Sequence, residues 1–146
     1  MSKMIFVNLP VADLARSIAF YEAVGFVRDD RFCDGTAQMM TWDETIHIML
    51  LTHEKFASFT PKAIPDARTQ AQVFFALSVE SRAEVDAIVD RAIAAGGGAD
   101  PSPVDDMGFM YGRGYEDPDG HMIGINWMDV EAMTAAMAAA TQPEPA

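Results

Sequence analysis

The sequence predicts an α+β fold in which two βαβββ modules form a cupped mixed sheet. A strand pattern, a helix pattern and a terminating glycine follow one another near the N-terminus, and the same order returns after residue 70. Residues 6–11 and 74–79 match at Phe, Leu and Val with one constant offset. Residues 117–120, Asp-Pro-Asp-Gly, have the composition of a tight turn that joins two strands. These three observations predict an internal duplication that ends in a β-hairpin.

The first module begins with a strand. Residues 4–10 are rich in apolar and β-branched side chains and end at a proline. Asp13 stands where a helix N-cap is expected, and Gly25 stands where a helix end favours a left-handed residue. The segment between them is therefore predicted to be a helix. Three short strands complete the module, over residues 26–30, 37–42 and 46–51.

The second module repeats this order. Residues 72–79 are predicted to form a strand, and Ser81 with Glu84 forms a capping box at the start of a helix. Residues 96–98 are three glycines, which end that helix. Two further strands follow, over residues 109–115 and 122–127, on either side of the tight turn.

These elements divide the chain into four parts. The first module takes residues 1–60, a crossover takes 61–70, the second module takes 71–129 and a tail takes 130–146. Residues 130–140 favour a helix by their alanine content, and residues 141–146 are expected to fray. No catalytic role is expected of the tail.

Composition excludes several classes of partner. The 146 residues carry a formal net charge of -12, whereas binding to nucleic acid or to an anionic membrane requires a basic surface. Such a charge either attracts a cationic small molecule or simply keeps the surface soluble. A hydrophobic content of 50% argues against disorder. No stretch is long and uncharged enough to span a bilayer.

The single cysteine indicates a reducing compartment. Cys33 cannot form an internal disulfide, which fits a reducing cytoplasm. Its neighbours provide no base at a spacing suited to a nucleophile, so Cys33 is interpreted as structural. The N-terminus also lacks the apolar run and small-residue cleavage site of a secretory signal. The sequence therefore predicts a soluble cytoplasmic protein.

Four short motifs occur in a distinctive order. They are residues 11–14 (Val-Ala-Asp-Leu), 17–21 (Ser-Ile-Ala-Phe-Tyr), 25–26 (Gly-Phe) and 116–121 (Glu-Asp-Pro-Asp-Gly-His). Together they resemble the vicinal oxygen chelate superfamily, which includes glyoxalase I, fosfomycin resistance proteins, extradiol dioxygenases and bleomycin resistance proteins. The resemblance implies a glyoxalase/bleomycin-resistance-like fold. Residues 49–56, 58–61 and 108–113 resemble a bacterial branch usually labelled predicted lactoylglutathione lyase.

The resemblance also implies where a metal would bind. In members that use a metal, four inward-facing side chains hold a divalent ion that polarises the substrate. The resemblance places these positions at Phe6, Met49, Phe74 and Gly124. A catalytic divalent ion needs nitrogen or oxygen donors, which none of these side chains supplies. The fold is therefore expected without its usual metal, and no cofactor is expected.

Strand alternation adds polar side chains to the surface that carries these four positions. Asn8, His47 and Asn126 each lie two residues from one of them. Two amides and one imidazole among apolar side chains are typical of a small-molecule pocket. The predicted substrate-binding set is Phe6, Asn8, His47, Met49, Phe74, Arg113, Gly124 and Asn126.

His47 has two interpretations. It is a candidate general base near neutral pH, or a ligand of a metal at a shifted site. A single inward histidine without a carboxylate partner, however, more often packs or forms hydrogen bonds, because metal sites need several convergent donors. The packing interpretation is favoured.

Arg113 also has two interpretations. It either binds an anionic substrate or pairs with a nearby carboxylate. The register of residues 109–115 decides where its side chain points, and the sequence leaves that register open. The resemblance favours the glycines of this strand facing the cavity. The carboxylates nearest in sequence are Asp105, Asp106 and Glu116.

Three functions follow from these observations. The first is a metal-independent protein that sequesters or carries a small molecule, as bleomycin resistance proteins do with a cationic drug. The second is an enzyme of the glyoxalase or dioxygenase type that uses a shifted metal site or His47. The third is a scaffold for dimerisation, since superfamily members commonly dimerise. The loss of all four ligand positions favours the first function, and a homodimer is the expected assembly.

Overall fold

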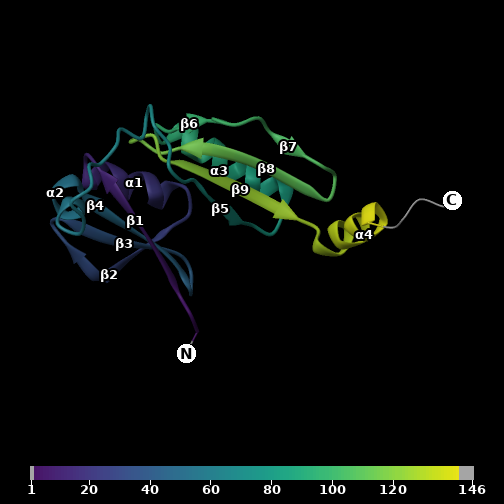
Figure 1. Ribbon diagram of the computed structural model, residues 1–146, viewed down its shortest axis with the longest axis horizontal. Coiled ribbons are helices and arrows are strands. Elements are labelled where there is room, and N and C mark those ends of the chain that lie inside the picture. Colours follow the sequence, from purple (N-terminus) through teal and green to yellow (C-terminus); the bar gives the residue numbers. More distant parts are fainter. Residues whose placement is uncertain (1, 142–146) are drawn as a thin grey trace.

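The computed structural model describes residues 2–141 (Figure 1). The first half contains β1 (Ile5–Val11), α1 (Leu14–Ala23), β2 (Val27–Asp34), β3 (Ala37–Asp43), β4 (Ile46–Thr52) and α2 (His53–Ala57). The second half contains β5 (Phe75–Ser78), α3 (Arg82–Ala94), β6 (Gly98–Ala99), β7 (Asp105–Asp106), β8 (Met110–Glu116) and β9 (Met122–Met128). A last helix, α4 (Val130–Thr141), follows.

The two halves have the same strand order. The first sheet runs β1-β4-β3-β2 and the second runs β5-β9-β8-β6, with the short β7 also paired to β8. In each sheet the strand that begins the module is parallel to its neighbour, and the remaining pairs are antiparallel. The predicted α+β class with two modules is therefore confirmed, and each module forms its own mixed sheet (Figure 1).

The strand register extends the repeat to individual residues. The matching sequence segments, residues 6–11 and 74–79, align Asn8 with Ala76. In the structure Asn8 pairs with Met49, and Ala76 pairs with Gly124. The register therefore makes Met49 and Gly124 equivalent positions in the two modules.

Side-chain caps fix the ends of the helices. At the start of α1, Asp13 Oδ1 accepts a hydrogen bond from the Arg16 N–H at 3.0 Å. At the start of α3, Ser81 Oγ accepts one from the Glu84 N–H at 3.2 Å. Each cap satisfies a backbone donor that has no partner inside the helix. Gly25 follows α1 with a φ of +112°, a left-handed conformation that favours glycine.

One hydrophobic core joins the two modules. α1 packs on the first sheet, α3 packs on the second, and the two helices contact each other. The rings of Phe20 on α1 and Tyr115 on β8 lie with their centroids 5.6 Å apart. Gly97 allows this close approach, because a Cβ there would lie 2.8 Å from Phe20 Cε2. Each sheet therefore has one face covered by its helix and one face that α1 and α3 leave open.

The connection between the modules begins with α2. Thr52 caps this short helix, since its side chain accepts a hydrogen bond from the Lys55 N–H at 3.1 Å. β5 begins at Phe75, where its pairing with β9 also begins. Residues 72–74, which were predicted within a strand, therefore precede the second sheet and belong to the connection.

The helix α4 stands away from the rest of the molecule (Figure 1). Its side chains are exposed apart from Met133, which is half-buried. The helix predicted over residues 130–140 is present and includes Thr141. The remaining residues predicted to fray, 142–146, lie outside the described part of the chain. Over residues 2–141, no helix combines the length and the apolar character needed to cross a bilayer.

Candidate functional site

The open face of the first sheet carries four of the predicted residues. Phe6 and Asn8 lie on β1, and His47 and Met49 lie on β4. The register pairs Phe6 with His47 and Asn8 with Met49. Leu9, which follows Asn8, points to the opposite side and belongs to the core. These four residues therefore share the face that strand alternation predicts.

His47 is enclosed by its neighbours. It is 3% exposed, and the ring of Phe6 stacks on the imidazole with 5.1 Å between centroids. Nε2 lies 3.2 Å from the carbonyl oxygen of Glu44, which only accepts, so Nε2 carries the proton. Nδ1 then accepts a hydrogen bond from the Thr41 hydroxyl at 2.9 Å. Both ring nitrogens are engaged, which is the arrangement of a packing residue rather than of a general base.

Glycines form the floor of the open face of the second sheet. Gly114 on β8 pairs with Gly124 on β9, and Gly112 pairs with Asn126. The Asn126 carboxamide lies over Gly112, in the space that a Cβ would need. A hollow of about 220 Å³ lies on this face and is also lined by Phe74. Gly112 and Gly114 of β8 therefore line the hollow, and Arg113 between them contributes to the same lining.

Arg113 extends to the other side of β8, toward α3. Its Nη2 donates to Asp100 Oδ2 at 2.8 Å and its Nη1 donates to Asp86 Oδ1 at 3.0 Å. The Tyr111 hydroxyl donates to the same oxygen of Asp86 at 2.6 Å. Hydrogen bonds from Tyr111 and Arg113 lower the pKa of Asp86, and those from Arg113 lower the pKa of Asp100. In the described structure the guanidinium is thus bound by carboxylates other than the three considered from sequence.

The two halves of the predicted site do not meet within one chain. Four of the predicted residues, Phe74, Arg113, Gly124 and Asn126, line the hollow on the second sheet, and no residue of the first sheet lines it. Phe6 and Met49 lie on the open face of the first sheet, and the modules are joined through their helices. The four positions that the resemblance assigns to a metal therefore form two separate pairs in the described chain.

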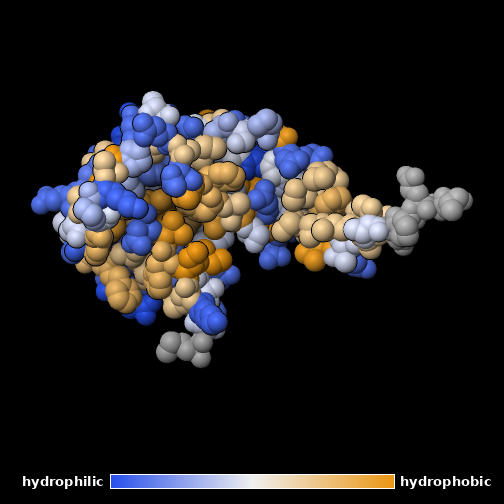
Figure 2. All heavy atoms as spheres, viewed as in Figure 1, coloured by the Kyte–Doolittle hydropathy of each residue, from blue (hydrophilic) through white to orange (hydrophobic). Residues whose placement is uncertain are grey.

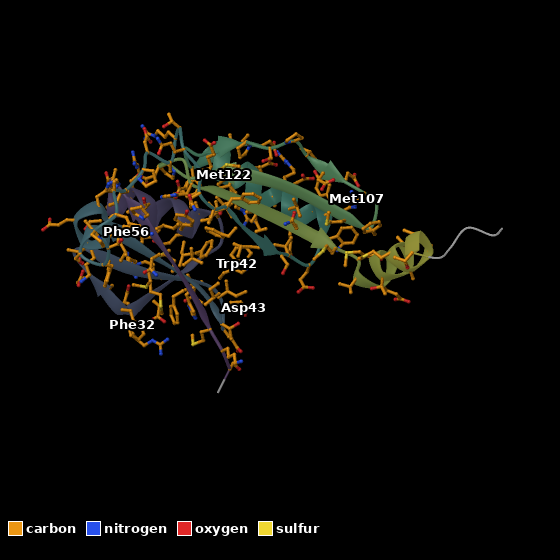
Figure 3. All side chains as sticks on the ribbon, in the orientation of Figure 1. Phe32, Trp42, Asp43, Phe56, Met107 and Met122 are labelled. Carbon is orange, nitrogen blue, oxygen red and sulfur yellow. The ribbon has the colours of Figure 1, made fainter. Side chains whose placement is uncertain are left out.

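A larger cavity lies where the connection between the modules passes the ends of both sheets. Its volume is about 630 Å³, and its walls come from β1, residues 60–73 and the start of β9. Its apolar lining includes Phe56 of α2 and Met122 of β9, both labelled in Figure 3. Its polar lining comprises Asn8, Thr60, Lys62, Gln70, Gln72 and His121. Of these residues, only Asn8 was predicted from the sequence.

The hairpin turn, residues 117–121, fixes one wall of this cavity. Asp117 is 3% exposed and accepts a hydrogen bond from the Tyr21 hydroxyl on α1 at 2.7 Å. It also accepts from the N–H groups of Asp119 and His121, both at 2.9 Å. Burial raises the pKa of Asp117, and burial together with the nearby carboxylate raises the pKa of Tyr21. One side chain therefore shapes the turn and ties it to the first module.

Two more residues of the hairpin turn contact the first module. Asp119 Oδ1 accepts a hydrogen bond from the Ala12 N–H at 2.8 Å, just before α1. His121 Nε2 donates to the Pro10 carbonyl oxygen at 2.8 Å, at the end of β1. The hairpin turn, which the sequence predicted only as a link between two strands, thus connects the two modules beside the cavity.

A family model describes most of this fold. The model for the Glyoxalase/Bleomycin resistance protein/Dioxygenase superfamily matches residues 3–125. The chain belongs to this superfamily, the vicinal oxygen chelate superfamily. Among curated proteins, none matches the sequence.

Several solved structures have the same fold. The hypothetical protein SA1046 from S. aureus is 25% identical, with a TM-score of 0.72, over 87% of this chain and 94% of that one. A glyoxalase/bleomycin resistance protein/dioxygenase family enzyme from Burkholderia phytofirmans PsJN is 22% identical, with a TM-score of 0.70, over 87% of this chain and 99% of that one. The fosfomycin resistance protein FosX from Listeria monocytogenes is 17% identical, with a TM-score of 0.63, over 90% of this chain and 97% of that one.

The divalent ion used by metal-dependent members of the superfamily does not fit the side chains of this chain. The four corresponding positions offer two phenyl rings, a thioether and a glycine, at Phe6, Phe74, Met49 and Gly124. None supplies the nitrogen or oxygen donors that such an ion requires. Over residues 2–141, no three His, Cys, Asp or Glu side chains are grouped so that they could hold a metal ion.

Proposed function

We propose that the chain binds a small organic molecule without the divalent ion of its superfamily. The observation that carries this proposal is the cavity of about 630 Å³, a volume typical of small-molecule sites. Its lining combines apolar side chains with a few amide and hydroxyl groups that can orient a ligand. Recognition would then depend on shape and hydrogen bonds, because the four positions that the resemblance assigns to a metal supply no nitrogen or oxygen donor.

A ligand of this cavity is expected to raise the melting temperature of the protein, and chelators should not change this effect. At a concentration of 100 times Kd, a ligand adds about 2.7 kcal/mol to the free energy of unfolding. Thermal shifts with a metabolite panel, with and without EDTA, measure the effect. Ala71→Trp should abolish it by filling the cavity, since Ala71 lines the wall. Ala83→Trp, on the exposed side of α3, is the matched control.

The alternative is a lactoylglutathione lyase or dioxygenase-type enzyme that uses a metal at a shifted site or His47 as a base. Stoichiometric metal in protein purified without a histidine tag would overturn the proposal. So would glyoxalase activity with nickel, zinc, iron or manganese that is lost in His47→Gln. The enclosed position of His47 supports the expectation that neither result is found.

We also infer a homodimer in which a second copy covers the open faces of the sheets. Large apolar side chains are exposed to solvent on or beside these faces, among them Phe6 of β1 at 46% and Phe74, which directly precedes β5, at 66% exposure. Figure 2 shows hydrophobic residues gathered across the middle of the molecule, between the two sheets. Such grouping is typical of interaction surfaces. In a two-fold dimer, the first sheet of one copy would face the second sheet of its partner, which would bring Phe6 and Phe74 together.

Light scattering is expected to give the mass of two chains. Phe74→Asp should shift the protein toward the monomer by placing a charge in the apolar interface. Phe59→Asp is a matched control, because Phe59 is 69% exposed and lies just beyond α2, outside both sheets. A wild-type monomer at every concentration, or equal effects of the two variants, would contradict the proposed interface.

The exposed cysteine bears on the cellular location of the protein. Cys33 is a free thiol on β2 within the described residues. An unpaired surface thiol persists in reducing surroundings, since oxidising ones favour disulfides. We therefore propose the cytoplasm as the location of the protein.

A further inference from the structure

The charge around the cavity differs from that of the chain as a whole. The sequence has 22 acidic residues against 10 lysines and arginines. Within the described chain, however, no aspartate or glutamate lines the cavity, whereas Lys62 and His121 do. The segment of residues 53–72 also has one more basic residue than acidic: Lys55, Lys62 and Arg68 against Glu54 and Asp66. The lining of this cavity therefore contains a cation and no carboxylate, although the chain as a whole is acidic.

Lys62 is an exposed residue of the cavity lining. Its backbone N–H donates to Thr60 Oγ1 at 3.1 Å, which fixes the turn that carries it. Its ammonium takes part in none of the ion pairs formed within residues 2–141. By contrast, Arg82 and Arg113 are both bound by carboxylates. The Thr60 hydroxyl also lines the cavity, and its hydrogen remains available to donate.

Amide groups add further donors to the same cavity. Gln70 and Gln72 line it, and both residues are exposed. Each carboxamide has two N–H donors. Asn8 contributes a third amide, whose single contact, to the Phe6 carbonyl oxygen at 3.4 Å, is long. An anion entering the cavity would therefore meet one cation and several neutral donors without a competing carboxylate.

We propose that the cavity binds an amphipathic organic anion, with a carboxylate or similar oxyanion at Lys62 and an apolar body in the cavity. The body would pack against Phe56, Ile64, Val73 and Met122, which line the remaining wall. This inference rests on the proposed binding function, because it names the class of ligand. The net charge of -12 would by itself attract a cation rather than an anion, so the local lining has to outweigh it.

Calorimetric titration with three matched probes tests this class. Phenylbutyrate, phenylbutanol and phenylbutylamine share an apolar body and differ in charge. Phenylbutyrate is expected to bind tightest, and Lys62→Gln should weaken it about tenfold while leaving phenylbutanol unchanged. Lys62→Glu should reverse the order, so that the amine binds better than the acid. Raised salt should weaken the acid more than the alcohol.

Lys55→Gln is the control for these variants. Lys55 is a nearby lysine on α2 that does not line the cavity, and its ammonium lies 5.4 Å from the centroid of the Phe59 ring. It should leave all three affinities unchanged. Equal binding of the three probes, unaffected by Lys62→Gln but lost in Ala71→Trp, would overturn the anion class and leave the binding function intact. Equal affinities in Ala71→Trp and wild type would overturn both proposals.

Discussion

Replacing Asp117 with alanine is expected to lower the free energy of unfolding by about 3 to 5 kcal/mol. The carboxylate is buried and accepts three hydrogen bonds, one of them from the fully buried Tyr21. Alanine leaves the Tyr21 hydroxyl without an acceptor and also releases two backbone donors of the hairpin turn. Urea denaturation followed by tryptophan fluorescence measures the loss.

Two further variants separate hydrogen bonding from a general effect of removing aspartate. Asp117→Asn keeps one acceptor oxygen for the backbone donors, so it should cost only about 1 to 2 kcal/mol. Asp105→Ala, at an exposed position on β7, should change stability by less than about 0.5 kcal/mol. A loss below about 1 kcal/mol in Asp117→Ala would show that the hairpin turn is held by other contacts.

The burial of Asp117 also predicts how the difference in stability between wild type and Asp117→Asn depends on pH. Burial raises the pKa of this carboxyl above its ordinary value of 3.8. Between the two values the folded protein binds more protons than the unfolded chain, so its stability falls as pH rises. The stability of wild type relative to Asp117→Asn should therefore be greatest in acid and decline as pH rises through the raised pKa. A difference that grows with pH would show that the three donors outweigh burial.

Local signals predicted the fold because each acts over a few residues. Asp13 and Ser81 cap the helices that their positions predicted, and Gly25 ends the first helix in the expected conformation. Strand alternation also placed Asn8 on the face of Phe6 and His47 on the face of Met49, since side-chain direction within a strand depends only on parity. The resemblance favoured the glycine side of β8 as the cavity lining, and Gly112 and Gly114 line a hollow on the second sheet together with Arg113.

Contacts between distant segments were not predictable in the same way. Arg113 pairs with Asp86 because α3 packs on β8, whereas sequence proximity suggested carboxylates near its own strand. The cavity was missed because residues 60–73 have no periodic pattern that assigns them to a face. Their position is set by tertiary contacts, such as the hydrogen bond at 3.0 Å from Arg68 Nη2 to the Pro118 carbonyl oxygen.

Gly120→Ala is expected to destabilise the protein by about 3 to 5 kcal/mol, through backbone strain and overpacking together. Gly120 has a φ of +98°, which strains any residue with a Cβ. A Cβ there would also lie 2.8 Å from the Cα and N atoms of Arg68. Those atoms are backbone and cannot move aside as a flexible side chain can, so the connection between the modules must shift. Urea denaturation measures the stability loss.

Two other glycines separate the causes of that loss. Gly108 has a φ of +80° with open space around its Cβ position, so Gly108→Ala should cost only the strain, about 1 to 2 kcal/mol. Gly35 has neither constraint, and Gly35→Ala should stay within about 0.5 kcal/mol of wild type. Equal losses in Gly108→Ala and Gly120→Ala would show that the contact with Arg68 carries no energy. A larger loss in Gly120→Ala, with weaker probe binding in the folded variant, would show that the hairpin turn sets the shape of the cavity.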